Sequence, residues 1–262
     1  MQFIDTHTHL YLPEFDADRD EMVNRAVRKG IVKMLMPNID IHSVKSMLSA
    51  EQRYKDVCYS MTGLHPTSVR EDYLSQLDKL EDLYGKHKFI AIGEIGIDMY
   101  WDRTFLKEQI IAFRRQISFA LDKKLPIVIH SRDSFPEVFS VIDEFKGTGL
   151  RGVFHAFTGN IKEAERALNM GFKLGIGGIV TFKNSGLDKV VKETGPENLI
   201  LETDSPYLAP VPYRGKRNES AYICLINKKL SDIFGISEAE VASVTYTSSV
   251  KLFNLDENHE TQ

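Results

Sequence analysis

The chain has 262 residues, of which 42% are hydrophobic and 27% are charged, so it is long enough to bury a large core. Its formal net charge of -4 excludes a broadly basic surface of the kind that coats nucleic acids, so an anionic substrate would need a local basic patch or bound cations. No apolar run approaches the roughly 18 residues of a membrane span, and no Pro-, Ser- or Gly-rich linker divides the chain. We therefore expect one domain over residues 1–262, located in the cytoplasm, with Cys58 and Cys224 as reduced thiols.

Short apolar segments alternate with longer amphipathic ones, which is the pattern of a parallel sheet with helical crossovers. The predicted strands are residues 3–5, 32–36, 57–62, 89–93, 127–129, 153–155, 172–177 and 199–203. Helix-like segments include residues 19–29, 41–53, 105–121, 135–145, 161–170 and 187–193. A loop at 205–218, helices at 221–234 and 238–253, and a polar tail at 254–262 that we expect to fray follow the last strand. Eight β/α units in about 250 residues predict an α/β protein with a (β/α)8 TIM barrel.

His7 and His9 follow the first predicted strand and are two residues apart. Side chains at positions i and i+2 of a strand share one face, so the two imidazoles can bind one cation. Such a pair can equally cap a hydrogen-bond network or face solvent. Metal binding is favoured because further potential ligands follow later apolar runs, namely Glu94, His130, His155 and Asp204. The carboxyl ends of barrel strands meet at one face, so we expect all six side chains to converge.

Six donors exceed the three protein ligands that one catalytic metal usually takes, so the sequence predicts two divalent cations. A carboxylate has two oxygens, and Glu94 on the central fourth strand is the natural bridge. We expect one metal to bind His7, His9, Glu94 and Asp204, and the other to bind Glu94, His130 and His155. These nitrogen and oxygen donors do not choose among Mg, Mn and Zn.

Several motifs, in order from end to end of the chain, resemble those of one family. They include Ile4-Asp5-Thr6-His7-Thr8-His9-Leu10, Gly63-Leu64-His65-Pro66, Leu201-Glu202-Thr203-Asp204-Ser205-Pro206 and its continuation to residue 210, and residues 92–98, 129–132, 154–159, 178–184 and 214–219. With these motifs the chain resembles the TatD family of metal-dependent deoxyribonucleases, within the amidohydrolase-like barrel superfamily.

The resemblance implies a divalent-cation phosphodiesterase that removes nucleotides from the 3′ ends of DNA. It implies that the six donors named above form the metal site, and that His65 lies beside the metals and the substrate phosphate. The chain departs from the family pattern at Thr67, where another histidine is frequent, and at Met99-Tyr100-Trp101, where paired tyrosines are frequent. Both departures bear on substrate preference rather than on metal binding.

A mechanism follows from these assignments. We expect Glu94 and Asp204 to be catalytic, with Asp204 also accepting the proton of the attacking water. The predicted substrate contacts are His65 and Lys183 to phosphate oxygens, Arg214, Lys216 and Arg217 along the backbone, and Tyr207, Tyr100 or Trp101 against a terminal base. The basic loop is equally compatible with a solvated turn. Arg132 is expected either to pair with a carboxylate and orient the loop around His130, which is favoured, or to contact substrate. Glu202 is expected either to orient a ligand or to hold the basic loop.

The predicted substrate is therefore a single-stranded DNA 3′ end, with no membrane and no obligate protein partner evident. Two other classes stay open. The same barrel with two metals hydrolyses amides and other esters, although those relatives commonly use a carboxylated lysine as the bridge, where this chain has Glu94. The chain could also be a non-catalytic metal-binding scaffold, but such a protein would be free to lose some of the six ligands.

Overall fold

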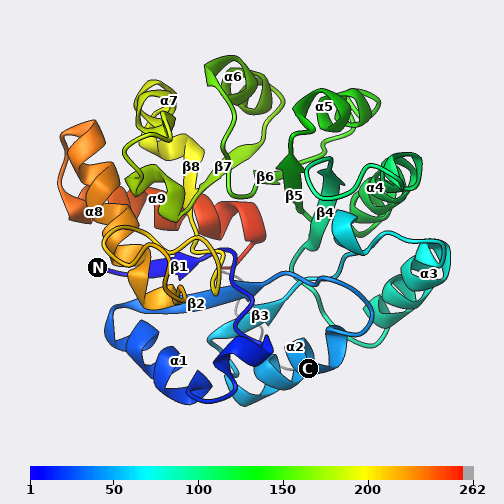
Figure 1. Cartoon of the computed structure of the whole chain (residues 1–262), viewed down its shortest axis with the longest axis horizontal. Helices are drawn as coiled ribbons and strands as arrows, with labels where there is room; N and C mark the ends of the chain where they lie inside the picture. Colours follow the sequence, from blue (N-terminus) through cyan, green and yellow to red (C-terminus); the bar gives the residue numbers. More distant parts are fainter. Residues whose placement is uncertain (256–262) are drawn as a thin grey trace.

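A computed structural model of the protein describes residues 1–255. Eight parallel strands alternate with helices along the chain, as the sequence predicts. The strands are β1 (Phe3–Asp5), β2 (Ile31–Met36), β3 (Cys58–Ser60), β4 (Ile92–Asp98), β5 (Ile127–Arg132), β6 (Gly152–Phe154), β7 (Lys173–Ile176) and β8 (Leu199–Leu201). The helices are α1 (Arg19–Arg28), α2 (Val44–Arg53), α3 (Tyr73–Tyr84), α4 (Leu106–Lys123), α5 (Phe135–Asp143), α6 (Ile161–Asn169), α7 (Leu187–Thr194), α8 (Ile223–Phe234) and α9 (Glu238–Phe253). Figure 1 shows α1 to α8 arranged around the strands in chain order.

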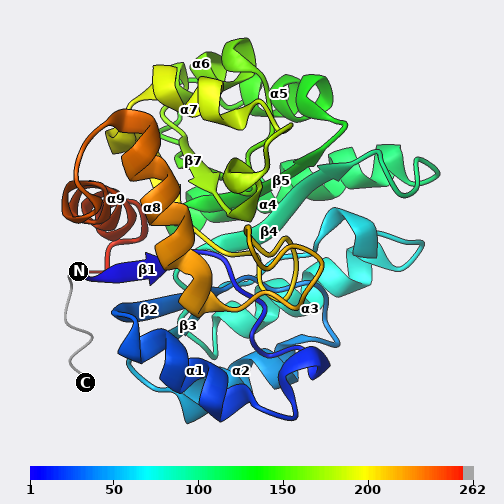
Figure 2. The ribbon, with the colours of Figure 1, turned by 60° about the vertical axis from the view of Figure 1, so that its left-hand side comes forward.

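The strands pair in two arcs, β1-β2-β3 and β4-β5-β6-β7-β8. Backbone hydrogen bonds join the arcs along both edges. On one edge the amide of Thr62 donates to Ala91, and on the other the amides of Thr6 and Asp204 donate to Leu201 and His7. Figure 2 shows the second edge, where the loop between β8 and α8 lies beside the segment that follows β1. This is the barrel that the sequence predicts.

Apolar side chains from seven strands or their flanking residues fill the interior of the barrel, and the C-terminal turn of α9 packs against them. They are Ile4, Leu35, Met61, Ala91, Val128, Val153 and Ile200, in contact with Val250, Leu252 and Phe253. A larger apolar cluster lies between the strands and the surrounding helices. The two layers hold the strands in fixed register, so the residues at the strand ends have defined positions.

Helix ends follow the local sequence signals. Asn160 accepts hydrogen bonds from the amides of Lys162 and Glu163 and so caps α6. Ser237 caps α9 in the same way through Glu240. Across residues 1–255, no helix combines the length and the apolarity needed to cross a bilayer.

Three predictions of element position need correction or comment. Helix α3 is absent from the predicted segments, although Leu77 and Leu80 give it an apolar face. Strand β4 begins at Ile92 rather than at residue 89, and continues to Asp98, so Glu94 lies inside the strand rather than after it. The strand continues past Gly93 because the polar side chains of Glu94 and Asp98 face the barrel interior. All seven residues of β4 are therefore buried. The expected fraying concerns a tail that, from residue 256 on, lies outside the described residues.

Candidate metal centre

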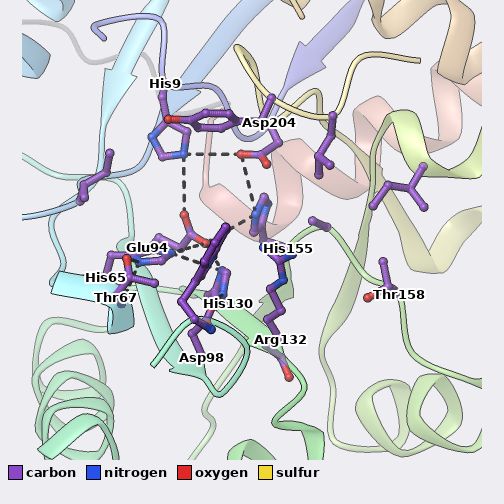
Figure 3. A pocket seen from close by; sticks show the side chains of 17 residues that line it. His9, His65, Thr67, Glu94, Asp98, His130, Arg132, His155, Thr158 and Asp204 are labelled. Carbon is purple, nitrogen blue, oxygen red and sulfur yellow. Dashed lines mark hydrogen bonds and ion pairs between the residues drawn. The ribbon is translucent and has the colours of Figure 1, made fainter. Parts of the chain in front are cut away.

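The six predicted ligands come from five different strands or the residues that follow them, at one end of the barrel. Five of them line a pocket of about 740 Å³, and the sixth, His7, is fully buried. Figure 3 shows Glu94 at the centre of this pocket, between His9, His65, His130 and Asp204. The convergence follows from parallel strands that begin at one end of the barrel and finish at the other.

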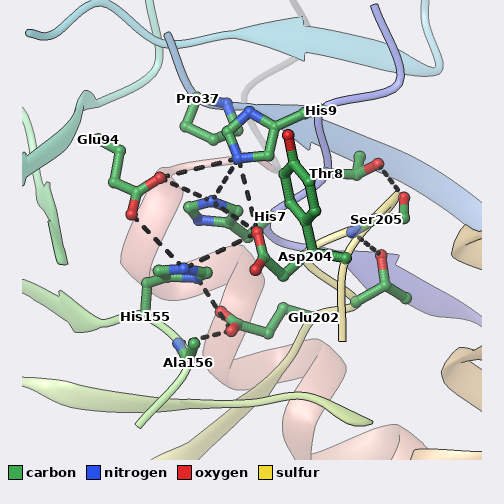
Figure 4. A network of polar contacts seen from close by, with 12 residues as sticks. His7, Thr8, His9, Pro37, Glu94, His155, Ala156, Glu202, Asp204 and Ser205 are labelled. Carbon is green, nitrogen blue, oxygen red and sulfur yellow. Dashed lines mark hydrogen bonds and ion pairs between the residues drawn. The ribbon is translucent and has the colours of Figure 1, made fainter. Parts of the chain in front are cut away.

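One group of donors lies on the Oε2 side of Glu94. The Nε2 atoms of His7 and His9 are 3.2 Å apart, and they lie 3.1 and 3.8 Å from Glu94 Oε2. They lie 3.7 and 3.5 Å from Asp204 Oδ1. A tetrahedral site with bonds of about 2.1 Å places its ligand atoms about 3.4 Å apart, which is the spacing observed here. His7, His9 and Glu94 Oε2 therefore fit one cation, and Asp204 Oδ1 lies beside the same two imidazoles (Figure 4).

A second group of donors lies on the Oε1 side of Glu94. His130 Nδ1 is 2.7 Å from Oε1, His65 Nε2 is 3.3 Å away and His155 Nε2 is 3.5 Å away. The two oxygens of one carboxylate therefore face two different sets of imidazoles. His65, predicted as a phosphate contact, lies as close to Glu94 as His155 does and is a further candidate ligand.

Each of three imidazoles is held at the nitrogen that points away from Glu94. Tyr11 Oη donates to the carbonyl of Pro37, so its lone pair accepts the proton of His9 Nδ1 at 3.1 Å. This arrangement places the free lone pair of His9 on Nε2, toward the pocket.

Carboxylates perform the same function for the other two imidazoles. Asp98 Oδ2 lies 2.8 Å from His130 Nε2, and Glu202 Oε1 lies 3.0 Å from His155 Nδ1. Glu202 also accepts a 2.6 Å hydrogen bond from the amide of Ala156, so its position is fixed. In each ring the nitrogen that remains for a cation faces Glu94, which is how protein metal ligands are commonly oriented.

Electrostatics also favour a cation. Burial opposes ionisation of Glu94, but the nearby imidazoles of His65, His155 and His7 outweigh it and hold the pKa of Glu94 well below its usual range. Burial likewise opposes ionisation of Asp204, whose pKa is lowered by its hydrogen bond to His9 and by the other histidines. Among residues 1–255 no lysine or arginine pairs with either carboxylate. The neighbouring imidazoles supply the compensating positive charge by protonation, and a divalent cation would replace it.

Asp5 joins the two strand ends that carry His7 and Asp204. Its Oδ1 accepts from the amide of Thr203 at 2.9 Å, and its Oδ2 lies 2.6 Å from Thr203 Oγ1. The backbone of Asp204 has a φ of 56°, a conformation uncommon outside glycine, and its amide donates to the carbonyl of His7. These bonds hold the carboxylate in place over the pocket.

A sequence model of the TatD related DNase family matches residues 4–254. The uncharacterized metal-dependent hydrolase YabD of Bacillus subtilis is 34% identical over 253 residues, which cover 96% of this chain and 99% of YabD. The chain belongs to the TatD related DNase family. Another relative, the 3′-5′ ssDNA/RNA exonuclease TatD of Pectobacterium parmentieri, is 28% identical over 257 residues, 96% of this chain and 99% of that protein.

Solved structures agree with this family membership. The crystal structure of YjjV, a TatD homologue from Escherichia coli K12, superposes with a TM-score of 0.90 at 27% identity, covering 96% of this chain and 98% of YjjV. A TatD-family hydrolase from Entamoeba histolytica gives a TM-score of 0.84 at 25% identity over 97% of this chain and 98% of that one. The predicted family, the TIM-barrel fold and the metal-dependent hydrolase class are confirmed.

The predicted substrate residues of this TatD-family protein fall into two groups. His65 and Tyr207 line the pocket, whereas Lys183, Arg214, Lys216 and Arg217 do not. Both terminal nitrogens of Arg217 lie 2.7 Å from the Asp18 carboxylate. Arg214 lies over the Phe182 ring, 4.5 Å from its centroid. These contacts favour a structural role for the two arginines, in holding the loop after β8.

Two residues that position the TatD-family site were not predicted. Asp98 could have been identified from sequence spacing, because it lies four residues after Glu94 on one strand and therefore lies on the same face of that strand. Tyr11 could not have been identified in this way, because it lies in the irregular segment after β1, where sequence spacing does not predict where a side chain points. The expected ion pair of Arg132 is not found among residues 1–255; its guanidinium lies over aromatic rings instead.

Proposed function

We propose that this TatD-family hydrolase removes nucleotides from the 3′ ends of single-stranded DNA, using two divalent cations bound on either side of Glu94. The observation that carries the proposal is the division of donors between the two oxygens of that carboxylate. His7, His9 and Asp204 would complete one site with Oε2. His130 and His155, with His65 adjacent, would complete the other with Oε1.

Two cations held by these residues would supply charge neutralisation for a phosphodiester and lower the pKa of a water molecule. The side chains supply the remaining steps. Asp204 is the more accessible carboxylate, with 14% of its side chain exposed against 3% for Glu94. Its lowered pKa keeps it ionised, so Asp204 Oδ can accept the proton of the attacking water.

A nucleic-acid substrate is supported by the family and by the relative named as a 3′-5′ ssDNA/RNA exonuclease. The pocket also suits a strand end. His65, Thr67 and Tyr207 line it, and a phosphodiester would have to reach the buried Glu94 within it. A free single-stranded terminus can enter such a pocket more easily than the middle of a duplex.

The proposal is tested with a 5′-labelled single-stranded oligodeoxynucleotide that carries either a free or a blocked 3′ end. We expect a ladder of products that shortens from the free 3′ end, requires a divalent cation and stops in excess chelator. The blocked strand should be degraded far more slowly. Equal rates on the two strands would contradict end recognition. Inactivity on DNA and RNA beside rapid hydrolysis of amides or other esters would assign the pocket to that second class of substrate.

A further inference from the structure

The turn after β4 carries an unusually exposed aromatic side chain at the pocket. Trp101 lines the pocket and is 69% exposed, the highest value among the large hydrophobic side chains exposed in residues 1–255. Its neighbour Tyr100 is 53% exposed. Exposed apolar surface beside a pocket commonly marks a binding surface. Here the surface lies beside the carboxylates and imidazoles of the candidate metal centre.

This turn is held by the same carboxylate that orients His130. Asp98 Oδ1 accepts hydrogen bonds from the amides of Tyr100 and Trp101, at 3.0 and 3.1 Å. Asp98 Oδ2 lies 2.8 Å from His130 Nε2. The backbone that carries the tryptophan is therefore fixed relative to the metal-binding side chains. A fixed backbone reduces the conformational freedom that is lost when a ligand stacks on the ring.

Arg132 supplies a positive charge beside the two rings. Its guanidinium carbon lies 3.8 Å from the centroid of Tyr100 and 5.3 Å from that of Trp101. The two rings meet edge to face at 5.0 Å. Because Arg132 forms no ion pair within residues 1–255, its donors can bind an anionic ligand, and its contact with the Tyr100 ring holds the guanidinium beside Trp101.

We propose that Trp101 and Arg132 form a nucleotide subsite, in which Trp101 stacks on a base adjacent to the cleaved phosphodiester and Arg132 binds a neighbouring phosphate. The inference rests on the proposed function, because it gives that function a substrate contact. Stacking on an aromatic ring accepts any base, since every base has a π face. The subsite therefore favours strands with unpaired bases and gives little sequence preference.

Kinetics with substituted proteins test the subsite. Removal of one base-aromatic stack weakens binding by about 5- to 100-fold, so Trp101→Ala should raise KM for single-stranded DNA by a factor in that range, with a smaller effect on kcat. Trp101→Phe should restore much of the loss. Leu74→Ala is a matched control, because Leu74 is 49% exposed and does not line the pocket. An oligonucleotide without bases at its two 3′-terminal positions should bind wild type and Trp101→Ala equally.

Fluorescence provides a readout that does not depend on turnover. Trp101 is the only tryptophan in the chain, so its emission reports on this subsite alone. We expect quenching on titration with an oligonucleotide whose 3′-terminal linkages are hydrolysis-resistant phosphorothioates, and no quenching with its abasic counterpart.

The outcomes separate the two proposals. Suppose that wild type cleaves DNA, that Trp101→Ala has the same KM as wild type, and that no base-dependent quenching is observed. This result would overturn the subsite and leave the proposed function standing. Absence of DNA cleavage would overturn the proposed function. In that case base-dependent quenching would still support the subsite, and its absence would overturn the subsite too.

Discussion

Glu94 lies between two sets of imidazoles, and three of these rings are oriented by contacts on their far side. Asp98, Glu202 and Tyr11 contact the outer nitrogens of His130, His155 and His9. Such contacts fix which nitrogen carries the lone pair before a ligand arrives. Cation affinity in this protein should therefore depend on Glu94 more than on any single histidine, because Glu94 alone places one oxygen in each group.

Replacement of Glu94 by Gln tests this dependence. A neutral amide has only one acceptor oxygen and no charge, so Glu94→Gln should bind fewer than two divalent cations per chain, with reduced occupancy of both positions. The measurement is metal content after dialysis against a fixed free-metal concentration. Glu51→Gln is the control, because Glu51 is also largely buried but accepts its hydrogen bond from Ser60, outside the site. Two ions retained in Glu94→Gln would contradict the bridging role.

Asp5 gives the protein a pH-dependent stability. Burial raises the pKa of Asp5 to about 7, although hydrogen bonds from Thr203 oppose the shift. A folded-state pKa above the unfolded value means that the folded protein binds an extra proton between about pH 4 and 7. Its free energy of unfolding should then fall by about 1.4 kcal/mol per pH unit across that interval, relative to a protein without this group.

Asp5→Asn is the matching variant. An amide preserves the shape and can donate to Thr203 Oγ1 while accepting from the Thr203 amide, but it does not titrate. Urea unfolding at several pH values should show wild type losing stability relative to Asp5→Asn as the pH rises to about 7, and a constant difference above it. Parallel profiles for the two proteins would mean that Asp5 is ionised throughout.

At the scale of elements, β7 packs so closely on β8 that no side chain can be accommodated at Gly175, beside Glu202. A Cβ added to Gly175 would lie 2.3 Å from Glu202 Oε2 and 3.2 Å from the Cα of His155. The same atom on Gly177 would meet nothing nearer than 3.7 Å. The spacing of two strands therefore sets the position of a ligand on a third, His155 after β6.

Gly175→Ala should displace Glu202, release His155 and lower metal affinity or kcat by about 10- to 100-fold, the usual cost of losing a residue that orients a ligand. Gly177→Ala should behave like wild type. Titration of activity against metal concentration measures both variants, and circular dichroism verifies that they fold. If the two variants match each other, the contact between β7 and Glu202 does not position His155.

The sequence predicted most elements and all six converging donors, because each donor follows or ends an apolar run whose length indicates a strand. The prediction failed where strand limits and side-chain contacts depend on how the segments pack together. The limits of β4 were misplaced because Gly93 and Gly96 interrupt its apolar pattern while the barrel interior accepts Glu94 and Asp98. The contacts of Arg217 with Asp18 and of Arg132 with Tyr100 were not predictable, since they join segments whose relative position only the fold determines.

At the scale of the whole molecule, a net charge of -4 must be reconciled with a polyanionic substrate. Few phosphate contacts are available, so binding should be weak and should weaken further in salt. We expect KM for single-stranded DNA to rise with salt while kcat stays nearly constant. Lys216→Ala should reduce the slope of log KM against log salt concentration by the amount expected for the loss of about one phosphate contact. Arg217 is unsuitable for the test because its ion pair with Asp18 holds the loop.

Lys86→Ala is the control for this experiment, because Lys86 lies between α3 and β4, at the opposite end of the barrel from the pocket. It should keep the salt dependence of wild type. Equal slopes for Lys216→Ala and wild type would indicate that the loop after β8 is a solvated turn without a role in DNA binding.

The central claim is that Glu94 separates two cation positions at the carboxyl end of the barrel. It is tested most directly by anomalous diffraction from crystals grown with Mn²⁺. The account predicts two peaks about 3.5 to 4 Å apart, one beside His7, His9 and Asp204 and the other beside His130 and His155, each in contact with one oxygen of Glu94. A single peak at saturating Mn²⁺, or peaks that do not contact Glu94, would contradict it.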